Sequence, residues 1–224
     1  MREWLLRWMT PDSFGEGGSA AYNVHSLYLD GPDWSIYRET AAGAFSRYKL
    51  RARCYDFEPD SPIFLEVKQR DGEAMSKTRA PVTKVQALAV LSGGVPLDMV
   101  PTRATENFRK EVDRRRAFPR VWVTYRRHAY VATEGRELVR VTFDTRIKCA
   151  LPNADLSEPD RWMDLPSSQG VEILELKYTL SYPAWVGDMV RRFHLIRKSM
   201  SKYRHSVDLL MERGLAGSPR RLAG

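Results

Sequence analysis

Five segments of the sequence alternate between apolar and polar residues with a period of two. Successive side chains of a β-strand point to opposite faces, so each segment forms one apolar and one polar face if it is a strand. The residues that then share the polar faces are Lys49, Arg51 and Arg53; Glu66 and Lys68; Trp122, Thr124 and Arg126; Arg140, Thr142 and Asp144; and Glu175 and Lys177. The pattern predicts an antiparallel sheet with opposite charges on one face.

The remaining sequence signals place these strands in an α+β fold. Runs of β-branched and aromatic residues between loop-like segments predict strands at residues 22–30, 48–55, 63–70, 120–127, 138–148 and 171–178. Helices are predicted at residues 81–91, 105–116, 183–198 and 206–213. We therefore expect a single domain over residues 1–213, with an antiparallel sheet and flanking helices, followed by a disordered basic tail at residues 214–224.

Net charge favours a polyanionic partner. Lys and Arg total 36 against 28 Asp and Glu, a formal charge of +8. Nucleic acid, a membrane surface and a phosphate compound all fit this excess, as does a merely basic surface. Two cysteines are too few for a disulfide framework or a zinc site, and no apolar run reaches the roughly 20 residues of a membrane span. We expect a cytoplasmic protein with no direct membrane insertion.

Two arrangements of the sheet remain open. One is a sheet with a single solvated face. The other is a closed β-barrel whose charged face points inward, with helices covering the outside. Repeated basic residues, with a carboxylate on three strands, favour the barrel, because Arg and Lys bind phosphates and carboxylates bind hard divalent cations. The side chains expected to share one cavity are Lys49, Arg51, Arg53, Arg126, Arg140 and Lys177.

Seven short blocks, taken in order, resemble the VTC domain, the catalytic domain of the vacuolar transporter chaperone complex. That domain belongs to the triphosphate tunnel metalloenzymes, a CYTH-like superfamily. The blocks are Ser-Leu-Tyr-Leu-Asp at 26–30, Lys-Leu-Arg-Ala-Arg at 49–53, Phe-Leu-Glu-Val-Lys at 64–68, Tyr-Arg-Arg at 125–127, Val-Arg-Val-Thr-Phe-Asp at 139–144, Leu-Glu-Leu-Lys-Tyr at 174–178 and Ser-Lys-Tyr at 201–203.

This resemblance implies an eight-stranded antiparallel tunnel that uses ATP, a Mn²⁺ or Mg²⁺ ion, and a triphosphate or polyphosphate ligand. Matched motif by motif, the phosphate-binding residues would be Lys49, Arg51, Arg53, Lys68, Arg126, Arg140, Lys177 and Lys202. The main metal ligand would be Glu175, with Glu66 and Asp144 as weaker candidates. Catalysis would rest on Arg51, Arg53 and Glu175. Lys77 and Arg79 would either close over the tunnel mouth or lie in a solvated loop.

One departure from the family pattern bears on catalysis. Family members usually begin with a strand of the form Arg-x-Glu-x-Lys-Tyr. Residues 1–9 of this sequence instead resemble the end of the helix that follows that strand, so we expect either that the sequence starts downstream of this strand or that the protein lacks this tunnel wall.

The resemblance favours an inorganic polyphosphate polymerase, which transfers phosphoryl groups from ATP to a growing chain in a metal-dependent reaction. Attack by water would make the same site a triphosphatase. A domain that binds polyphosphate without turning it over is a third possibility, which the missing strand favours. Specific nucleic-acid binding is not expected, because it rests on net charge alone. The sequence contains no Gly-x-x-x-x-Gly-Lys-Ser/Thr loop, and its four histidines lack a close metal spacing.

Overall fold

A computed structural model describes residues 1–14, 20–96, 98–134, 137–179, 181 and 183–216. The chain forms two compact units. Unit 1 comprises residues 1–23, 125–146 and 168–200, and unit 2 comprises residues 24–124, 147–167 and 201–224. The long strands β6 (Phe118–Glu134) and β7 (Glu137–Ala150) contribute residues to both units.

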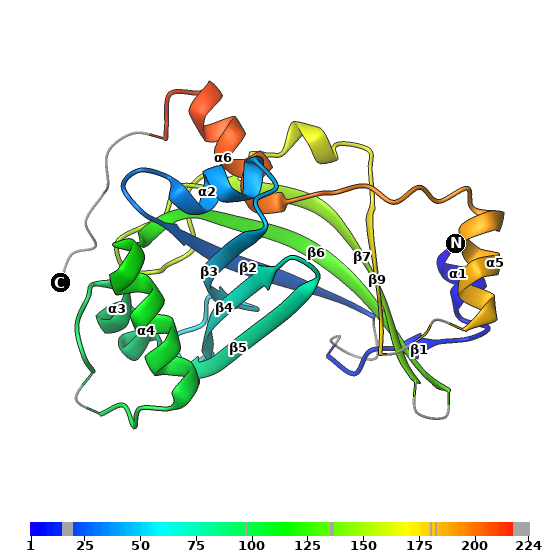
Figure 1. Ribbon diagram of the computed structural model, residues 1–224, viewed down its shortest axis with the longest axis horizontal. Helices are drawn as coiled ribbons and strands as arrows, with labels where there is room; N and C mark the ends of the chain where they lie inside the picture. Colours follow the sequence, from blue (N-terminus) through cyan, green and yellow to red (C-terminus); the bar gives the residue numbers. More distant parts are fainter. Residues whose placement is uncertain (15–19, 97, 135–136, 180, 182, 217–224) are drawn as a thin grey trace. The chain divides into compact units, whose positions relative to one another are not determined.

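An antiparallel sheet is the main element of the fold (Figure 1). Its other strands are β1 (Thr10–Pro11), β2 (Ala21–Asp30), β3 (Ser46–Cys54), β4 (Ile63–Asp71), β5 (Ala74–Val82), β8 (Met163–Asp164) and β9 (Ile173–Tyr178). The strand order is β5-β4-β3-β2-β6-β7-β8, with β1 paired to β6 and β9 paired to β7. The predicted antiparallel α+β class is confirmed. The pairings among the described residues leave the sheet open, so closure into a barrel is not confirmed.

Six α-helices flank the strands within the described part of the chain. They are α1 (Arg2–Leu5), α2 (Ser35–Ala41), α3 (Lys84–Leu91), α4 (Arg103–Arg115), α5 (Ala184–Arg192) and α6 (Lys202–Glu212), with a short 3₁₀ turn at Pro166–Ser168. In unit 2, α3 and α4 pack on β4, and α4 also packs on β3 and β5. The helix α4 buries Phe108 and Val112, four residues apart on one helix face, and begins with a capping box at Thr102.

The core of unit 2 follows from strand alternation. Leu50 lies opposite both Leu29 and Val67 in the strand register, and all three side chains are buried. Ala52 and Leu65 form the next buried pair along β3 and β4. Burial of a Leu or Val side chain contributes about 1.5–3 kcal/mol, so this apolar face fixes the strand register. The opposite face of the same strands therefore carries the charged side chains.

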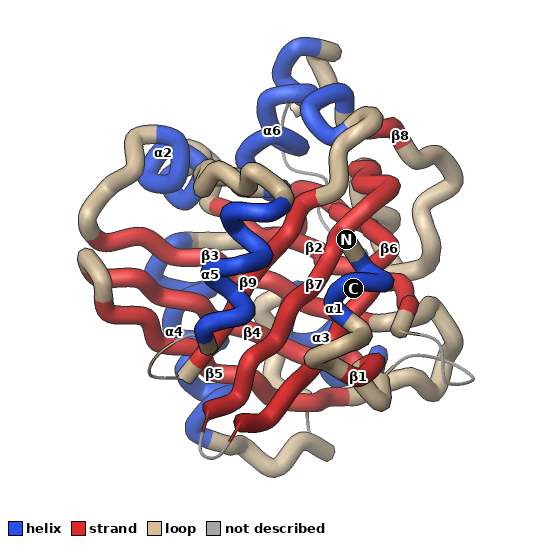
Figure 2. The backbone as a smooth tube through the Cα atoms, turned by 90° about the vertical axis from the view of Figure 1, so that its right-hand side faces the viewer, coloured by secondary structure: helices blue, strands red, loops and turns tan. Residues whose placement is uncertain are grey.

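Unit 1 has its own core, built between β7 and the helix α5. The side chains Val139, Val141 and Phe143 of β7 pack with Trp185, Val186 and Met189 of α5, and α1 adds Leu5. Figure 2 shows α1 and α5 lying over β7 and β9. The β9 side chains Leu174 and Leu176 pack against the same core, so Glu175 and Lys177 project from the other face.

All six predicted strands occur, with shifted ends, but the sequence did not predict β5. Its residues Ser76 to Arg79 are polar and mostly exposed, which is also typical of a loop. The helix α5 ends at Arg192, earlier than predicted, and His194 adopts the left-handed conformation with φ 49°. The helix α6 begins earlier than predicted, because the Ser201 side chain caps it by accepting from the backbone N–H of Arg204.

Two further predictions concern the ends of the chain and the membrane. Most of the predicted tail, residues 217–224, lies outside the described residues. Within the described part of the chain, every helix is too short or too polar to cross a bilayer.

Candidate functional site

Three lysines form a row across neighbouring strands of unit 2. Lys49 on β3 lies directly opposite Lys68 on β4, and Lys68 lies opposite Lys77 on β5. Like charges in directly opposed positions of a sheet destabilise it. A row of three ammonium groups is therefore the arrangement expected where the sheet binds an anion. The faces predicted from the sequence for Lys49 and Lys68 are confirmed by this register.

The next row places one carboxylate among basic groups. Glu66 lies opposite Arg51 on one side and Arg79 on the other. Its carboxylate is 2.6 Å from Arg51 Nη2, 2.8 Å from Lys77 Nζ and 3.5 Å from Arg79 Nε, and its side chain is 1% exposed. Burial works to raise the pKa of Glu66, but the charges of Arg51, Arg53 and Lys77 outweigh it and lower the pKa to about 2. Glu66 is thus an ionised counter-charge.

These rows define the basic face of unit 2. Seven of its residues lie on β3, β4 and β5, six of them cationic and one acidic: Lys49, Arg51, Arg53, Glu66, Lys68, Lys77 and Arg79. One register step further along the same face, Arg47 lies opposite Arg70. The sequence pattern predicts for Lys77 and Arg79 either a segment that closes over the tunnel mouth or a solvated loop, and it does not single out Arg47 or Arg70. An unpredicted strand, β5, brings Lys77 and Arg79 into the face.

Strand β2 borders the basic face with two hydroxyl groups. Arg53 Nε donates to Ser26 Oγ at 3.1 Å, and Arg51 Nη1 donates to the Tyr28 hydroxyl at 3.1 Å. Burial of the Tyr28 phenol works to raise its pKa, but the charges of Arg51, Lys49 and Arg53, with the Arg51 hydrogen bond, lower the pKa to about 8. Burial also lowers the pKa of Lys49.

The start of α6 adds polar groups to this face. Lys49 Nζ donates to Ser201 Oγ at 3.2 Å, and Lys202 follows as the first residue of α6. The segment is anchored by Tyr203, whose hydroxyl donates to Asp30 Oδ2 at 2.6 Å. Asp30 also accepts the backbone N–H group of Gly31 and those of Ile36 and Tyr37 in the first turn of α2. Burial nevertheless raises the pKa of Asp30.

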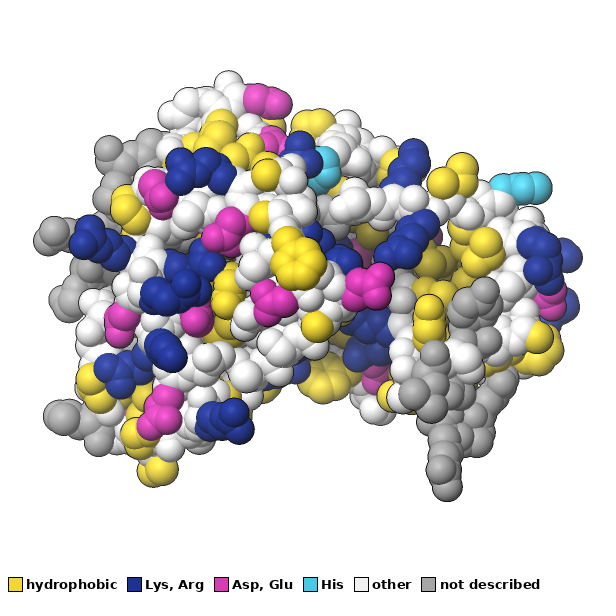
Figure 3. Space-filling view, viewed as in Figure 1, with side chains coloured by type: hydrophobic (Ala, Val, Ile, Leu, Met, Phe, Trp, Pro, Cys, Tyr) yellow, Lys and Arg dark blue, Asp and Glu magenta, His cyan; other side chains and the backbone are white. Residues whose placement is uncertain are grey.

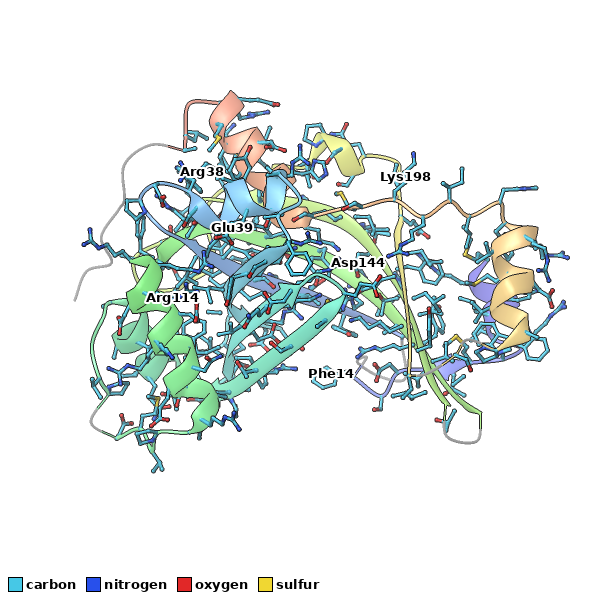
Figure 4. All side chains as sticks on the ribbon, viewed as in Figure 1. Phe14, Arg38, Glu39, Arg114, Asp144 and Lys198 are labelled. Atoms are coloured by element: carbon cyan, nitrogen blue, oxygen red, sulfur yellow. The ribbon has the colours of Figure 1, made fainter. Side chains whose placement is uncertain are left out.

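Figures 3 and 4 show the outer surroundings of these strands. Lys and Arg side chains are interspersed with Asp and Glu over α2 and α4 (Figure 3). Arg38 and Glu39 project from α2, and Arg114 projects from α4 (Figure 4). Arg115 of α4 pairs with Glu39 at 2.8 Å. Mixed pairs of this kind neutralise each other, whereas Lys49 and Lys68 place like charges opposite each other on β3 and β4.

Unit 1 carries a second charged group of residues. Arg127 donates from Nε and Nη2 to the two carboxylate oxygens of Asp144 at 2.7 and 2.8 Å. Asp144 lies on β7 (Figure 4) and is fully buried. Glu175 of β9 is 3.6 Å from Arg127 Nη2 and 3.2 Å from Lys177 Nζ, and it is 41% exposed. Arg127 and Asp144 thus form a buried bidentate pair, next to an exposed carboxylate.

Arg140 lies on the same face of β7 as Asp144. Its Nη2 is 2.7 Å from Asp12 Oδ2 and donates to the Tyr22 hydroxyl at 3.0 Å. Between Arg140 and Asp144, the buried hydroxyl of Thr142 has no hydrogen-bond partner within the described part of the chain. The register places Arg140 opposite Lys177 and Thr142 opposite Glu175, so these predicted residues share one face of unit 1.

Arg126 lies on the other face of β6 from Arg127. Adjacent strand residues point to opposite faces, and it is Arg127 that contacts Asp144. On the same face of β6 as Arg126, Thr124 Oγ1 is 3.0 Å from His25 Nδ1. His25 pairs with the buried Cys54, so this face is the one that points away from Arg53. The sequence predicted the alternation in β6 correctly but placed Trp122, Thr124 and Arg126 with the charged residues, where Arg127 lies instead.

The three predicted metal ligands differ in their surroundings. Glu66 and Asp144 are buried and have cationic groups within 2.8 Å of both carboxylate oxygens, which leaves them poorly suited to coordinate a metal. Glu175 is exposed and fits a single-carboxylate site of the kind that Mg²⁺ shares with phosphate oxygens. Among the described residues, no three His, Cys, Asp or Glu side chains are grouped for metal binding.

The sequence matches the VTC domain family over residues 1–211. The chain belongs to the VTC domain family. The resemblance predicted from the seven blocks is therefore confirmed. This VTC domain is also similar to a solved structure from Bacillus halodurans, described as a candidate adenylate cyclase, with 12% identity and a TM-score of 0.48 over 84% of this chain and 82% of that chain. A search of curated proteins finds no match.

Proposed function

We propose that this VTC domain binds a linear phosphate chain on the basic face of unit 2 and extends it with phosphoryl groups from ATP. The observation that carries this proposal is the lysine row Lys49–Lys68–Lys77. Opposed like charges destabilise the sheet, and the attraction of a bound polyanion to the lysines would offset that repulsion. Family membership supports the same class of ligand.

The arginines and the lysines of the basic face would bind phosphate in different ways. Arg51 and Arg53 are two residues apart on β3, so both guanidinium groups can contact one chain. They are held in place by Glu66 and Ser26. Preorganised cations of this kind bind the charge that develops on phosphate oxygens without having to reorient. Lys49, Lys68 and Lys202 add point charges beside them.

Phosphoryl transfer depends on position and charge more than on covalent participation of the protein. The end of the growing chain would attack the terminal phosphate of ATP. The partly buried guanidinium groups of Arg51 and Arg53 would orient the phosphates and limit the access of water. In the same proposal, Lys202 of unit 2 would bind a further phosphate, and Arg140 and Lys177 of unit 1 would bind phosphates on the charged face of that unit.

Glu175 is the residue that would hold a Mn²⁺ or Mg²⁺ ion, because its carboxylate is exposed and its ion pairs are long. Such an ion neutralises phosphate oxygens when bound. We expect Glu175→Gln to remove the dependence of ATP consumption on divalent cations while the protein stays folded. Unchanged activation by Mn²⁺ in this variant would exclude Glu175 as the ligand.

The decisive experiment incubates the purified protein with ATP and Mn²⁺ or Mg²⁺, and measures both polyphosphate and released phosphate. Polyphosphate that disappears in Arg51→Ala supports the proposal. Phosphate release without polymer identifies a triphosphatase of the same family. Calorimetric binding of tripolyphosphate without ATP consumption identifies a polyphosphate-binding module, and no binding at all overturns the proposed function.

A further inference from the structure

Tyr28 is an acidic hydroxyl placed inside a basic face. It lies on β2 directly opposite Arg51, and it is 5% exposed. Arg51 Nη1 donates to the phenolic oxygen at 3.1 Å, and the Arg51 guanidinium carbon is 5.8 Å from the ring centroid. Because an arginine can only donate, the Tyr28 oxygen is an acceptor in this contact. The contact favours the phenolate over the phenol.

The groups around Tyr28 reinforce this preference. The positive charges of Lys49, Arg51 and Arg53 on β3 favour the ionised form of Tyr28. From α6, the Tyr203 ring stacks on the Tyr28 ring at 4.9 Å, while its hydroxyl donates to Asp30. The Tyr203 hydroxyl is therefore engaged by the Asp30 carboxylate, while the cations of β3 favour the charged form of Tyr28. These are the charges that lower the pKa of Tyr28 to about 8 against the effect of burial.

We propose that the Tyr28 phenolate is a counter-ion of the basic face at mildly alkaline pH and takes up a proton when a phosphate chain binds there. The inference rests on the proposed function, since it requires an anion at Lys49, Arg51 and Arg53. The bound anion neutralises the cations that stabilise the phenolate. An O–H bond then forms on Tyr28 with a proton from solvent, and no other bond changes.

Proton uptake makes binding depend on pH in a defined direction. Only the phenol form coexists with the bound anion, so ionisation of Tyr28 competes with binding. With a pKa of about 8, the phenolate is a minor form at pH 7 and the dominant form at pH 9. The apparent Kd for tripolyphosphate should rise about tenfold between these two pH values through Tyr28 alone.

The test combines two measurements on the full chain. Near-ultraviolet difference absorbance follows phenolate formation during a pH titration, with and without tripolyphosphate. Calorimetry at pH 8, in two buffers of different ionisation enthalpy, gives the affinity for tripolyphosphate and the number of protons taken up. Both are applied to the wild type, Tyr28→Phe and Tyr37→Phe. The Tyr37 hydroxyl donates to Asp208, a hydrogen bond that raises its pKa, so Tyr37→Phe is the matched control.

We expect a phenolate that forms near pH 8 in the wild type and in Tyr37→Phe, is suppressed by tripolyphosphate, and is missing in Tyr28→Phe. Tyr28→Phe keeps the ring and its stack, and should lose the additional tenfold pH dependence. Tripolyphosphate itself titrates in the measurements on all three proteins, so its contribution cancels in the comparison. Tripolyphosphate binding with unchanged phenolate absorbance overturns this inference but leaves the proposed function intact. A lack of tripolyphosphate binding overturns both.

Discussion

At the scale of single residues, Arg51 and Arg53 should contribute most to binding. Each is partly buried and fixed by a hydrogen bond, so little side-chain entropy is lost when a ligand binds. A hydrogen bond to a charged group contributes about 1.5–3 kcal/mol, which corresponds to at least about tenfold in affinity. We expect Arg51→Ala and Arg53→Ala each to weaken tripolyphosphate binding by about tenfold or more in a calorimetric titration.

The matched control for these variants is Arg38→Ala. Arg38 is 63% exposed on α2 and pairs with the exposed Asp33, so its charge is screened by salt. Its replacement should leave the affinity unchanged. Equal losses in Arg38→Ala and Arg51→Ala would mean that binding is diffuse surface electrostatics.

Glu66 should link the stability of the fold to pH. Its pKa is lowered from 4.5 to about 2 in the folded protein, so its contribution is fully present above pH 4.5 and is lost as the pH falls toward 2. A shift of this size corresponds to roughly 3 kcal/mol at pH 7 and less than half of that near pH 3. Urea denaturation of Glu66→Gln and wild type should therefore differ most at neutral pH. A difference that is independent of pH would show that Glu66 does not act through its charge.

At the scale of elements, Tyr203 connects the start of α6 to β2 and α2 through Asp30. Tyr203→Phe removes one hydrogen bond from a buried carboxylate, which costs about 1–3 kcal/mol. We expect this loss in the free energy of unfolding, together with weaker tripolyphosphate binding, because Ser201 and Lys202 lie at the same helix start. Tyr37→Phe, at the more exposed Asp208, is the control and should lose less stability. Wild-type affinity in Tyr203→Phe would show that α6 is positioned without this bond.

The elements also show what a sequence can predict. Alternation in β3 and β4 is a local property, and the register confirms the predicted faces of Lys49, Arg51 and Glu66. In β6 both faces are buried from Val121 to Val123, so alternation alone could not tell which face meets the charged residues. The strand β5 was missed because its polar residues acquire a partner only when they pair with β4.

At the scale of the whole molecule, a net charge of +8 does not distinguish a phosphate chain from nucleic acid. The small exposed fraction of the cationic side chains does distinguish these two ligands. The Arg51 side chain is 15% exposed and Arg53 is 7% exposed, so their contacts suit a thin chain better than a duplex. The family assignment, which rests on the match over residues 1–211, points in the same direction.

We therefore expect duplex DNA to displace labelled polyphosphate poorly at equal phosphate concentration. Any DNA binding should fall steeply with salt, because it relies on exposed charges and counter-ion release. Polyphosphate binding should fall less steeply, since partly buried charges are screened less. A fluorescence competition assay at several salt concentrations, repeated with Arg51→Ala, measures both slopes. Competition by DNA as strong as that by polyphosphate, and unaffected by Arg51→Ala, would show that net charge rather than the basic face of unit 2 selects the ligand.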